Sequence, residues 1–216
     1  MTATSVLPQA VPLSLALREG TRGEHEAAER SGFVELLMSG ALDRSAYADL
    51  AAQQLAVYTA LEAAGSRLAA DGGLVFHELV RVPAIEQDLA FLYGEDWRTQ
   101  ARVLPATQAY VRRLEEVGGS LPLYAAHAYT RYLGDLSGGQ IIKRMLQRHY
   151  GFESAGIAFY DFPQIHKLKP FKDVYRERLD ALELDAGARA VVVEEARYAF
   201  RLNTAVFGEL GAVHVR

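Results

Sequence analysis

The sequence predicts an all-α protein with one helical domain. Apolar residues recur at helical spacing along most of the chain, as at Leu50, Leu61 and Leu68, whereas alternating apolar runs bounded by turn residues are scarce. No internal repeat or linker divides the chain, and 216 residues with 50% hydrophobic residues suit a single core. We therefore expect a flexible N-terminal segment over 1–12 and one domain over 13–216.

The predicted helices are justified by caps and breakers. The first helix carries His25, and Asp43 is placed to cap a long helix over about 44–70. Pro83 suits the first turn of the next helix, which Gly94 ends. Glycine and proline clusters bound the remaining helices, predicted at about 98–117, 122–150, 170–182 and 186–210.

Composition excludes several classes of protein. The chain has 23 basic and 27 acidic residues, a net charge of −4, which does not indicate a nucleic-acid binder. Without cysteine it has no disulfide, thiolate metal site or iron–sulfur cluster. No segment approaches the roughly 20 apolar residues that span a bilayer. The first basic residue is Arg18 and the C-terminus lacks a hydrophobic tail, so we expect a cytoplasmic protein without a membrane partner.

The histidines and glycine motifs exclude common metal and nucleotide sites. None of the six histidines follows a glutamate by three positions, so the Glu-x-x-His pairs of di-iron helical proteins are absent. His77-Glu78 begins like a zinc protease motif, but Arg81 stands in place of its second histidine. Neither a phosphate-binding nor a dinucleotide-binding glycine motif occurs.

A glycine-rich segment interrupts a predicted helix. Gly134, Gly138 and Gly139 fall within six positions, and each costs roughly 1 kcal/mol relative to alanine inside a helix. On a continuous helix Gly134 would lie under Gly138, and Asp135 under Gly139. This bare strip beside a carboxylate would let a flat ligand approach the backbone and would permit a kink. The alternatives are a close helix crossing or a break between two helices.

A lone histidine and two cationic pairs are further candidates. Glu29 follows His25 by four positions and could orient its ring toward a metal. Arg18 and Arg22 continue this row, and Lys172 and Arg176 form a similar pair elsewhere. A ligand with two carboxylates would need such cations. A surface or core histidine and solvated charges are the alternatives.

The segment AYTRYLGDLSGGQ, residues 128–140, resembles the signature of the haem oxygenase family. Five other stretches resemble the family in the same order, at 21–29, 58–62, 86–91, 110–113 and 200–207. The resemblance covers nearly the whole chain after Leu13. It implies an all-helical fold in which haem, both cofactor and substrate, lies between the first helix and a kinked, glycine-rich distal helix.

The resemblance also implies roles for individual residues. His25 matches the iron ligand, Glu29 its hydrogen-bonding neighbour, and Asp135 the distal carboxylate that orders water near the iron. The propionate-binding positions match Arg18, Arg22, Lys172 and Arg176, although the family often has lysine at the first two. The family's distal strip matches Gly134, Gly138 and Gly139, and its polar network matches Tyr58, Tyr110, Arg131 and Asn203. Its haem-wall aromatics match Phe200 and Phe207. Further pocket positions match Thr21, Tyr129 and Ser137.

The implied reaction opens haem with O₂ to biliverdin, carbon monoxide and ferrous iron. Because all four cationic positions are filled, we expect the α isomer of biliverdin. No flavin or nicotinamide motif is visible, so a separate ferredoxin or flavin reductase would supply electrons. The basic segment 167–178 is a candidate docking rim or a solvated face. A bilin-binding photoreceptor is a candidate product acceptor.

Two other functions share this architecture. A haem carrier or sensor would bind haem without degrading it, but it has no need of Asp135 beside an open iron position. A thiaminase-like helical enzyme would rely on a cysteine, which this chain lacks.

Overall fold

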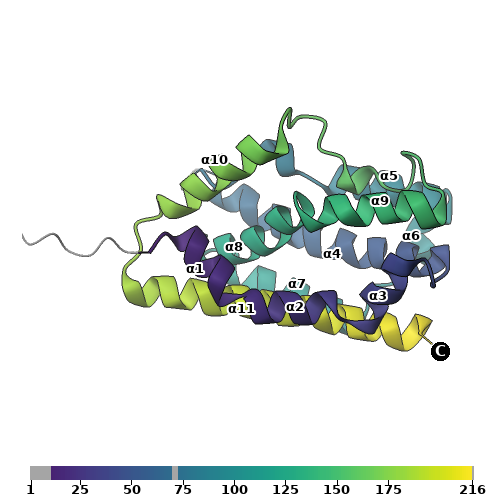
Figure 1. The fold of residues 1–216 in the computed structure, drawn as a ribbon, viewed down its shortest axis with the longest axis horizontal. Coiled ribbons are helices and arrows are strands. Elements are labelled where there is room, and N and C mark those ends of the chain that lie inside the picture. The colour runs from purple at the N-terminus through teal and green to yellow at the C-terminus, as the bar shows by residue number, and fades with distance from the viewer. Residues whose placement is uncertain (1–10, 70–72, 216) are drawn as a thin grey trace, which may run out of the picture.

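The fold consists of helices, as predicted. A computed structural model describes residues 11–69 and 73–215, and these residues contain no β-strand. The expected flexible segment 1–12 lies outside the described residues except for its last two positions. The elements, drawn in Figure 1, are α1 (Leu13–Gly20), α2 (Arg22–Glu29), α3 (Gly32–Ser39), α4 (Arg44–Leu68), η1 (His77–Leu79), α5 (Val82–Tyr93), α6 (Trp97–Gln100), α7 (Pro105–Val117), α8 (Leu121–Ala128), η2 (Tyr129–Leu133), α9 (Gly138–Tyr150), η3 (Ala158–Tyr160), α10 (Leu168–Asp180) and α11 (Ala186–His214).

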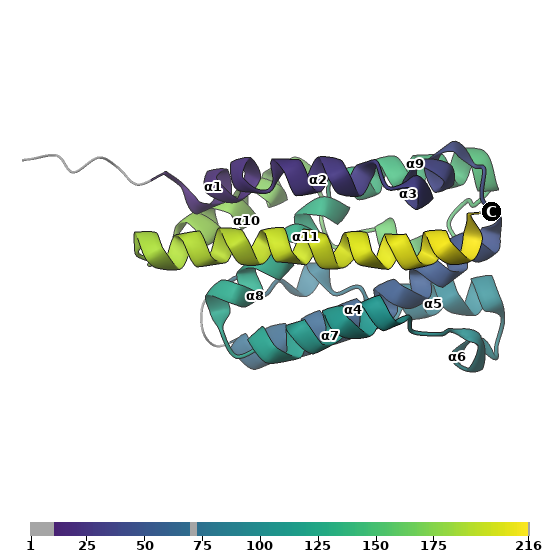
Figure 2. The same ribbon diagram turned by 90° about the horizontal axis from the view of Figure 1, so that it is seen from below.

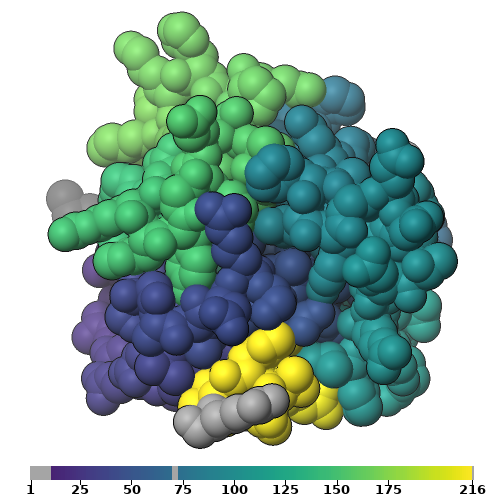
Figure 3. Space-filling view, turned by 90° about the vertical axis from the view of Figure 1, so that its right-hand side faces the viewer, coloured from purple at the N-terminus to yellow at the C-terminus, as the bar shows by residue number. Residues whose placement is uncertain are grey.

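Two long helices organise the molecule. α4 packs against α5 and α7, whereas α11 packs against α1, α2, α3, α7 and α8. Figure 2 shows α11 running the length of the molecule, with α1, α2 and α3 on one side and α7 on the other. At one end of the molecule, the C-terminal end of α11 (yellow in Figure 3) lies beside the segment that joins α3 to α4. There His214 Nε2 is 2.8 Å from Asp49 Oδ2, which ties α11 to α4. No described helix is long and apolar enough to cross a membrane.

The helix ends follow local capping chemistry. Asp185 accepts a 2.7 Å hydrogen bond from the Ala188 amide at the start of α11. Gly40 ends α3 with φ of 75°, a left-handed conformation that glycine adopts without steric cost. Asp43 precedes α4 as predicted, but its side chain forms no capping hydrogen bond, so that part of the prediction is wrong. The predicted end of this helix at Ala70 lies outside the described residues, and α4 ends at Leu68.

The predicted helix over 98–117 is two helices. α6 ends at Gln100, and α7 begins at Pro105 after an irregular segment. Proline lacks the amide hydrogen that a continuing helix needs, and it drives the preceding residue toward extended backbone. Leu104 has φ of −75° and ψ of 156°, as this rule expects.

The predicted helix over 122–150 is also interrupted. α8 passes into a π-helical turn, η2, and α9 begins only at Gly138. Between them Ser137 has φ of −123° and ψ of −84°, outside the helical range. The glycines lower the cost of leaving the helix, and π-turns are frequent at functional sites. The kink that the glycine-rich segment predicted is thus present, but the continuous helical register of Gly134 and Gly138 is not.

The segment carrying His25 keeps helical spacing across a small break. Thr21 separates α1 from α2, with φ of −106° and ψ of 6°. The Thr21 amide still bonds to Leu17 O at 3.0 Å, and the His25 amide bonds to Thr21 O at 2.9 Å. Arg18, Arg22 and His25 therefore stay in one row on the same wall.

Candidate functional site

A cavity of about 890 Å³ lies between α1–α2, α4, the kinked segment η2–α9 and α11. Its volume falls within the 300–1,000 Å³ range of ligand pockets. Most residues singled out in the sequence line it, namely Arg18, Thr21, Arg22, His25, Glu29, Tyr129, Arg131, Gly134, Asp135, Ser137, Gly138, Gly139, Arg176, Phe200, Asn203 and Phe207. Tyr58, Tyr110 and Lys172 do not line it.

His25 presents a lone imidazole on the α2 wall. Its side chain is 54% exposed, and its Nδ1 lies 3.6 Å from Glu29 Oε2, beyond a normal hydrogen bond but adjacent to it. The ring of Phe200 from α11 meets the His25 ring edge-on, with centroids 5.6 Å apart. The imidazole is therefore held between α2 and α11 while facing the cavity.

The facing wall is bare backbone. A Cβ atom added at Gly134 or Gly138 would have no neighbouring atom within 4 Å. Gly139 differs, because a Cβ there would lie 3.3 Å from the Tyr160 ring and 3.6 Å from Asp135 Cβ. Two of the three glycines thus leave room for a ligand, whereas the third permits close packing behind the segment.

Asp135 lies at this wall and is held from behind. It is 9% exposed, and its carboxylate accepts a hydrogen bond from the Tyr58 hydroxyl. Burial raises the pKa of Asp135 to about 6, although Arg131, Tyr58 and Arg81 act in the opposite direction. Burial also raises the pKa of Tyr58 well above its ordinary value, so Tyr58 remains a proton donor to the carboxylate.

A second polar group lies beside Tyr58. Arg131 Nη1 donates a 2.7 Å hydrogen bond to Asn203 Oδ1, which links η2 to α11. The Arg131 guanidinium also lies 4.9 Å from the centre of the Tyr58 ring. Tyr110 is fully buried behind the cavity, burial raises its pKa to about 12, and its hydroxyl has no protein partner within the described ranges. Arg131 and Asn203 therefore line the cavity, with Tyr58 packed against Arg131 and Tyr110 buried nearby.

Cationic side chains gather at one edge. Arg18 and Arg176, from α1 and α10, both act to lower the pKa of Tyr129, although burial raises it overall. These three side chains thus converge from separate elements. Lys172 Nζ donates a 3.1 Å hydrogen bond to Ser137 Oγ, which lines the cavity, so Lys172 lies just outside it.

Sequence reasoning missed three residues at the site. Gln54 and Tyr160 line the cavity, and Arg81 is buried where its charge acts on Asp135. The pair Gln53-Gln54 within an apolar helix was a usable signal for one of them. Arg81 and Tyr160 carried no signal, because only the tertiary fold brings them to Asp135.

The arrangement fits haem. A single imidazole faces a wall without side chains, and cations lie at one edge of the space between them. Proximal-histidine haem sites need one axial nitrogen, an opposite face that can be approached closely, and charge for the carboxylates. Within residues 11–69 and 73–215 no group of three or more histidine, aspartate or glutamate side chains could hold a bare metal ion.

Comparisons with known sequences agree with this geometry. The family model for heme oxygenase matches residues 11–209. Heme oxygenase 1 of Synechocystis sp. is 40% identical over 204 residues, covering 93% of this chain and 85% of that protein. Heme oxygenase 1 of Rattus norvegicus is 44% identical over 208 residues, covering 93% of this chain and 72% of that protein.

Solved structures agree as well. The crystal structure of heme oxygenase-1 from Synechocystis in complex with heme superposes with a TM-score of 0.90 at 39% identity, covering 94% of each chain. Heme oxygenase from Leptospira interrogans superposes with a TM-score of 0.87 at 39% identity, covering 92% of this chain and 100% of that one. The matched residues and the two-walled cavity lead to one conclusion, that the chain belongs to the haem oxygenase family.

Proposed function

We propose that the protein is a haem oxygenase that converts haem, O₂ and electrons to biliverdin, carbon monoxide and ferrous iron. One observation carries this proposal, namely that His25 and the bare backbone at Gly134 and Gly138 face each other across one cavity, with buried Asp135 beside the bare wall. When bound, haem supplies both the iron that activates oxygen and the ring that is opened.

The chain's own residues would hold the substrate in a fixed orientation. His25 would provide the axial nitrogen, and Glu29, 3.6 Å from its Nδ1, would orient the ring. Arg18, Arg22 and Arg176 line the cavity and would pair with the propionates, while Lys172 would act from the rim through Ser137. Phe200 and Phe207 would cover the apolar faces of the ring.

Asp135 would supply protons at the distal face. A carboxyl group whose pKa is about 6 can both hold and release a proton near neutral pH. Tyr58 donates to the carboxylate and Arg131 limits the rise of its pKa, so Asp135 stays oriented and titratable. Arg131 and Asn203 would order water between Asp135 and the substrate.

The cationic edge supports attack at the α position of the ring. A fixed set of cations on one side would fix how the ring is rotated in the cavity, and this rotation would decide which meso carbon is placed for attack. We expect biliverdin IXα, and chromatography of the bilin product checks this. A predominant β or δ isomer would contradict the assignment of the propionate side.

A separate electron donor would dock on α10. Residues 167–178 contain five basic and two acidic side chains, which suits an acidic ferredoxin or flavin reductase. We expect Lys169→Glu to slow turnover with a protein donor but not with ascorbate, with Arg148→Glu on α9 as the control. Equal loss of turnover with both reductants would contradict docking at this surface.

A bilin-binding photoreceptor as product acceptor and a cytoplasmic location stay predictions from the sequence.

The proposal is tested by adding haemin to the purified protein and then ascorbate under air. We expect the Soret band to decay while the red absorption of biliverdin grows. A Soret band that survives reductant would instead identify a haem carrier or sensor. No Soret shift on adding haemin would remove the haem assignment altogether.

A further inference from the structure

Arg81, between η1 and α5, is a buried cation whose guanidinium pairs with no carboxylate among the described residues. It is 5% exposed, and its guanidinium donates to four backbone carbonyl oxygens, those of Leu79 at 3.4 Å, Phe159 at 3.2 Å, Glu78 at 3.5 Å and Asp161. The Glu62 carboxylate accepts a 2.5 Å hydrogen bond from the backbone amide of Arg81 and none from its guanidinium. Arginine is almost never buried without a counter-charge, so this arrangement requires an explanation.

Two of these carbonyl oxygens belong to the η3 turn and the residue that follows it. Arg81 Nη1 donates to the carbonyls of Phe159 and Asp161. Gln140 Nε2 of α9 donates to the carbonyl between them, Tyr160 O, at 3.0 Å. The turn is therefore clamped between Arg81 and α9 over three successive residues.

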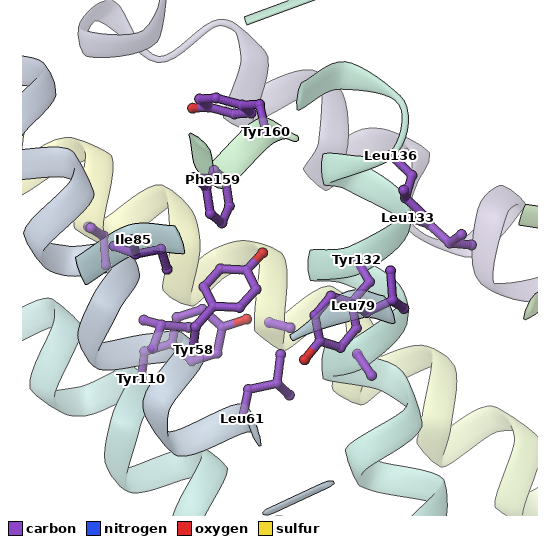
Figure 4. Packing of buried hydrophobic residues seen from close by; sticks show 14 of the residues in the cluster. Tyr58, Leu61, Leu79, Ile85, Tyr110, Tyr132, Leu133, Leu136, Phe159 and Tyr160 are labelled. Carbon is purple, nitrogen blue, oxygen red and sulfur yellow. The ribbon is translucent and has the colours of Figure 1, made fainter. Parts of the chain in front are cut away.

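The clamped turn reaches Asp135 by two routes. The Phe159 ring packs edge-on against the Tyr58 ring with centroids 5.3 Å apart, and the Tyr58 hydroxyl donates to the Asp135 carboxylate. Gln140 Nε2, which holds Tyr160 O, also lies 3.4 Å from Asp135 O. Figure 4 shows Phe159 between Tyr58 and Tyr160. The position of the turn thus bears on both the side chain and the backbone of Asp135.

The charge of Arg81 also acts on Asp135 directly. Burial raises the pKa of Asp135, and Arg131, Tyr58 and Arg81 oppose this rise. Burial lowers the pKa of Arg81, and Asp135 is the strongest of the groups that oppose this fall. The titratable groups that act on Asp135 or respond to its charge are Tyr58 of α4, Arg81, Tyr110 of α7, Arg131 of η2 and Tyr160 of η3.

We infer that Arg81 is a positioning residue for Asp135, because it fixes the η3 turn beside the kinked segment and supplies a buried positive charge near the carboxylate. Unlike Arg131, Arg81 does not line the cavity, so it acts through Asp135 and not on a ligand. The functional consequence rests on the proposed function: Arg81 helps Asp135 to ionise near neutral pH, as proton transfer requires.

The charge is tested by comparing Arg81→Gln with Arg81→Lys in the ligand-free full chain. Both replacements keep nitrogen–hydrogen donors, but only lysine keeps the positive charge. NMR titration of the Asp135 carboxyl carbon measures the pKa of that group. We expect Arg81→Gln to raise this pKa by roughly 0.5–1 unit, a three- to tenfold change in the ionisation constant, and Arg81→Lys to leave it close to that of the wild type. An unchanged pKa in Arg81→Gln, or an equal shift in both variants, would overturn the role of the charge.

Amide hydrogen exchange tests the clamp in the same two variants. The amides of Ala158 and Phe159 donate to the Asp88 carboxylate at 2.7 and 2.8 Å, so their exchange reports opening of the turn. Glutamine and lysine lack the forked guanidinium that bonds to carbonyls on both sides of Tyr160. We expect both amides to exchange faster in both variants, and unchanged exchange would overturn the clamp.

Arg44→Gln is the matched control. Arg44, although more exposed, also donates to a backbone carbonyl, that of Tyr150, and lies 5.0 Å from the centre of an aromatic ring, that of Phe152. It does not line the cavity, and its replacement should leave the pKa of Asp135 and the exchange of the η3 amides unchanged. A shift of the same size in this control would overturn the specific role of Arg81.

The haem assay separates this inference from the proposed function. If Asp135 supplies protons, the pH dependence of biliverdin formation should shift in Arg81→Gln in the same direction as the pKa of Asp135. A shifted pKa in the ligand-free chain without a shift in the pH dependence of turnover would support the role of Arg81 and contradict that of Asp135 as proton donor.

Discussion

Among the single residues, Asp135 combines a position at the cavity wall with a cost in stability. Its neighbours, Tyr58 and Arg131, partly compensate the burial of its charge, yet the pKa still rises from 3.8 to about 6. A folded protein that favours the protonated carboxyl loses stability as pH rises through this interval. The Asp135 carboxyl group therefore lowers the stability of the ligand-free fold at neutral pH.

Asp135→Asn tests this cost. Between about pH 4 and 6, Asp135 is protonated in the folded wild type but ionised in the unfolded chain. The free energy of unfolding of the wild type therefore falls as pH rises through this range, whereas that of the variant does not. At pH 7 we expect the ligand-free variant to be more stable by up to about 3 kcal/mol, and the difference to vanish below pH 4. Urea unfolding at several pH values measures it.

The exposed Asp43→Asn serves as the control for loss of a negative charge. Its unfolding curve should follow that of the wild type across the same pH range. A constant difference between Asp135→Asn and the wild type at every pH would show that Asp135 does not titrate as described.

At the scale of elements, the kinked segment η2–α9 provides the open wall. Gly134 has φ of −61° and ψ of −50°, which any residue adopts, and a Cβ there meets open space. Its glycine is therefore not required by backbone conformation or packing of the described residues. A larger side chain at position 134 would occupy part of the cavity.

Gly134→Leu should separate folding from ligand binding. We expect unchanged or slightly higher thermal stability, since leucine favours a helix more than glycine does. Haem affinity should fall about 10–100-fold, because overpacking costs about 1–3 kcal/mol. Gly208→Leu on α11 is the control, as Gly208 is exposed, equally unobstructed and outside the cavity. Equal haem affinity in both variants would contradict the open wall.

An ionic cluster around the buried Glu195 joins three helices outside the cavity. Arg113 of α7 donates to both oxygens of Glu195 on α11, at 2.9 and 2.6 Å, and His127 Nε2 of α8 lies 2.8 Å from Glu195 Oε1. Burial would raise the pKa of Glu195, but Arg113 and His127 outweigh it and lower the pKa to about 2. The cluster thus contributes stability above the ordinary pKa of 4.5, which is lost as pH falls toward 2.

We expect Glu195→Gln to lower the free energy of unfolding by about 3 kcal/mol at pH 7, because the buried His127 and the half-buried Arg113 lose their anion. The loss should shrink below pH 4.5 and disappear near pH 2. The neighbouring, exposed Glu194→Gln should change stability little. A similar loss in both variants, measured by chemical unfolding, would contradict the role of the cluster.

The elements also show what sequence alone can predict. Helical periodicity identified the long helices α4 and α11, and the glycine-rich segment predicted the kink, because these depend on local chemistry. The break before Pro105 was missed although proline signals it, since apolar periodicity continued across it. Arg81 and Tyr160 reach the site only through contacts between distant segments, which one sequence does not encode visibly, whereas the polar pair Gln53-Gln54 in an apolar helix was a signal for Gln54.

At the scale of the whole molecule, both cavity walls are attached to α11. α1 and α2 pack along it, and η2 is tied to it through Arg131 and Asn203. A ligand that bridges the walls should therefore stabilise the entire fold. We expect haemin at 100 times its Kd for the wild type to add about 2.7 kcal/mol of stability to the wild type, seen as a higher melting temperature. The same haemin concentration should stabilise His25→Ala less, because the variant binds haemin more weakly. An equal gain in both proteins would assign the iron ligand elsewhere.

We propose that one cavity both holds haem and directs its opening with the help of Asp135. The most direct measurement is the amount of carbon monoxide and biliverdin released per haem consumed, for the wild type and Asp135→Asn. We predict equal amounts of both products from the wild type, and retained haem with little of either product from the variant. Haem loss without carbon monoxide in the wild type would show that the cavity does not open haem in this way, and unchanged yields in the variant would show that Asp135 is not required.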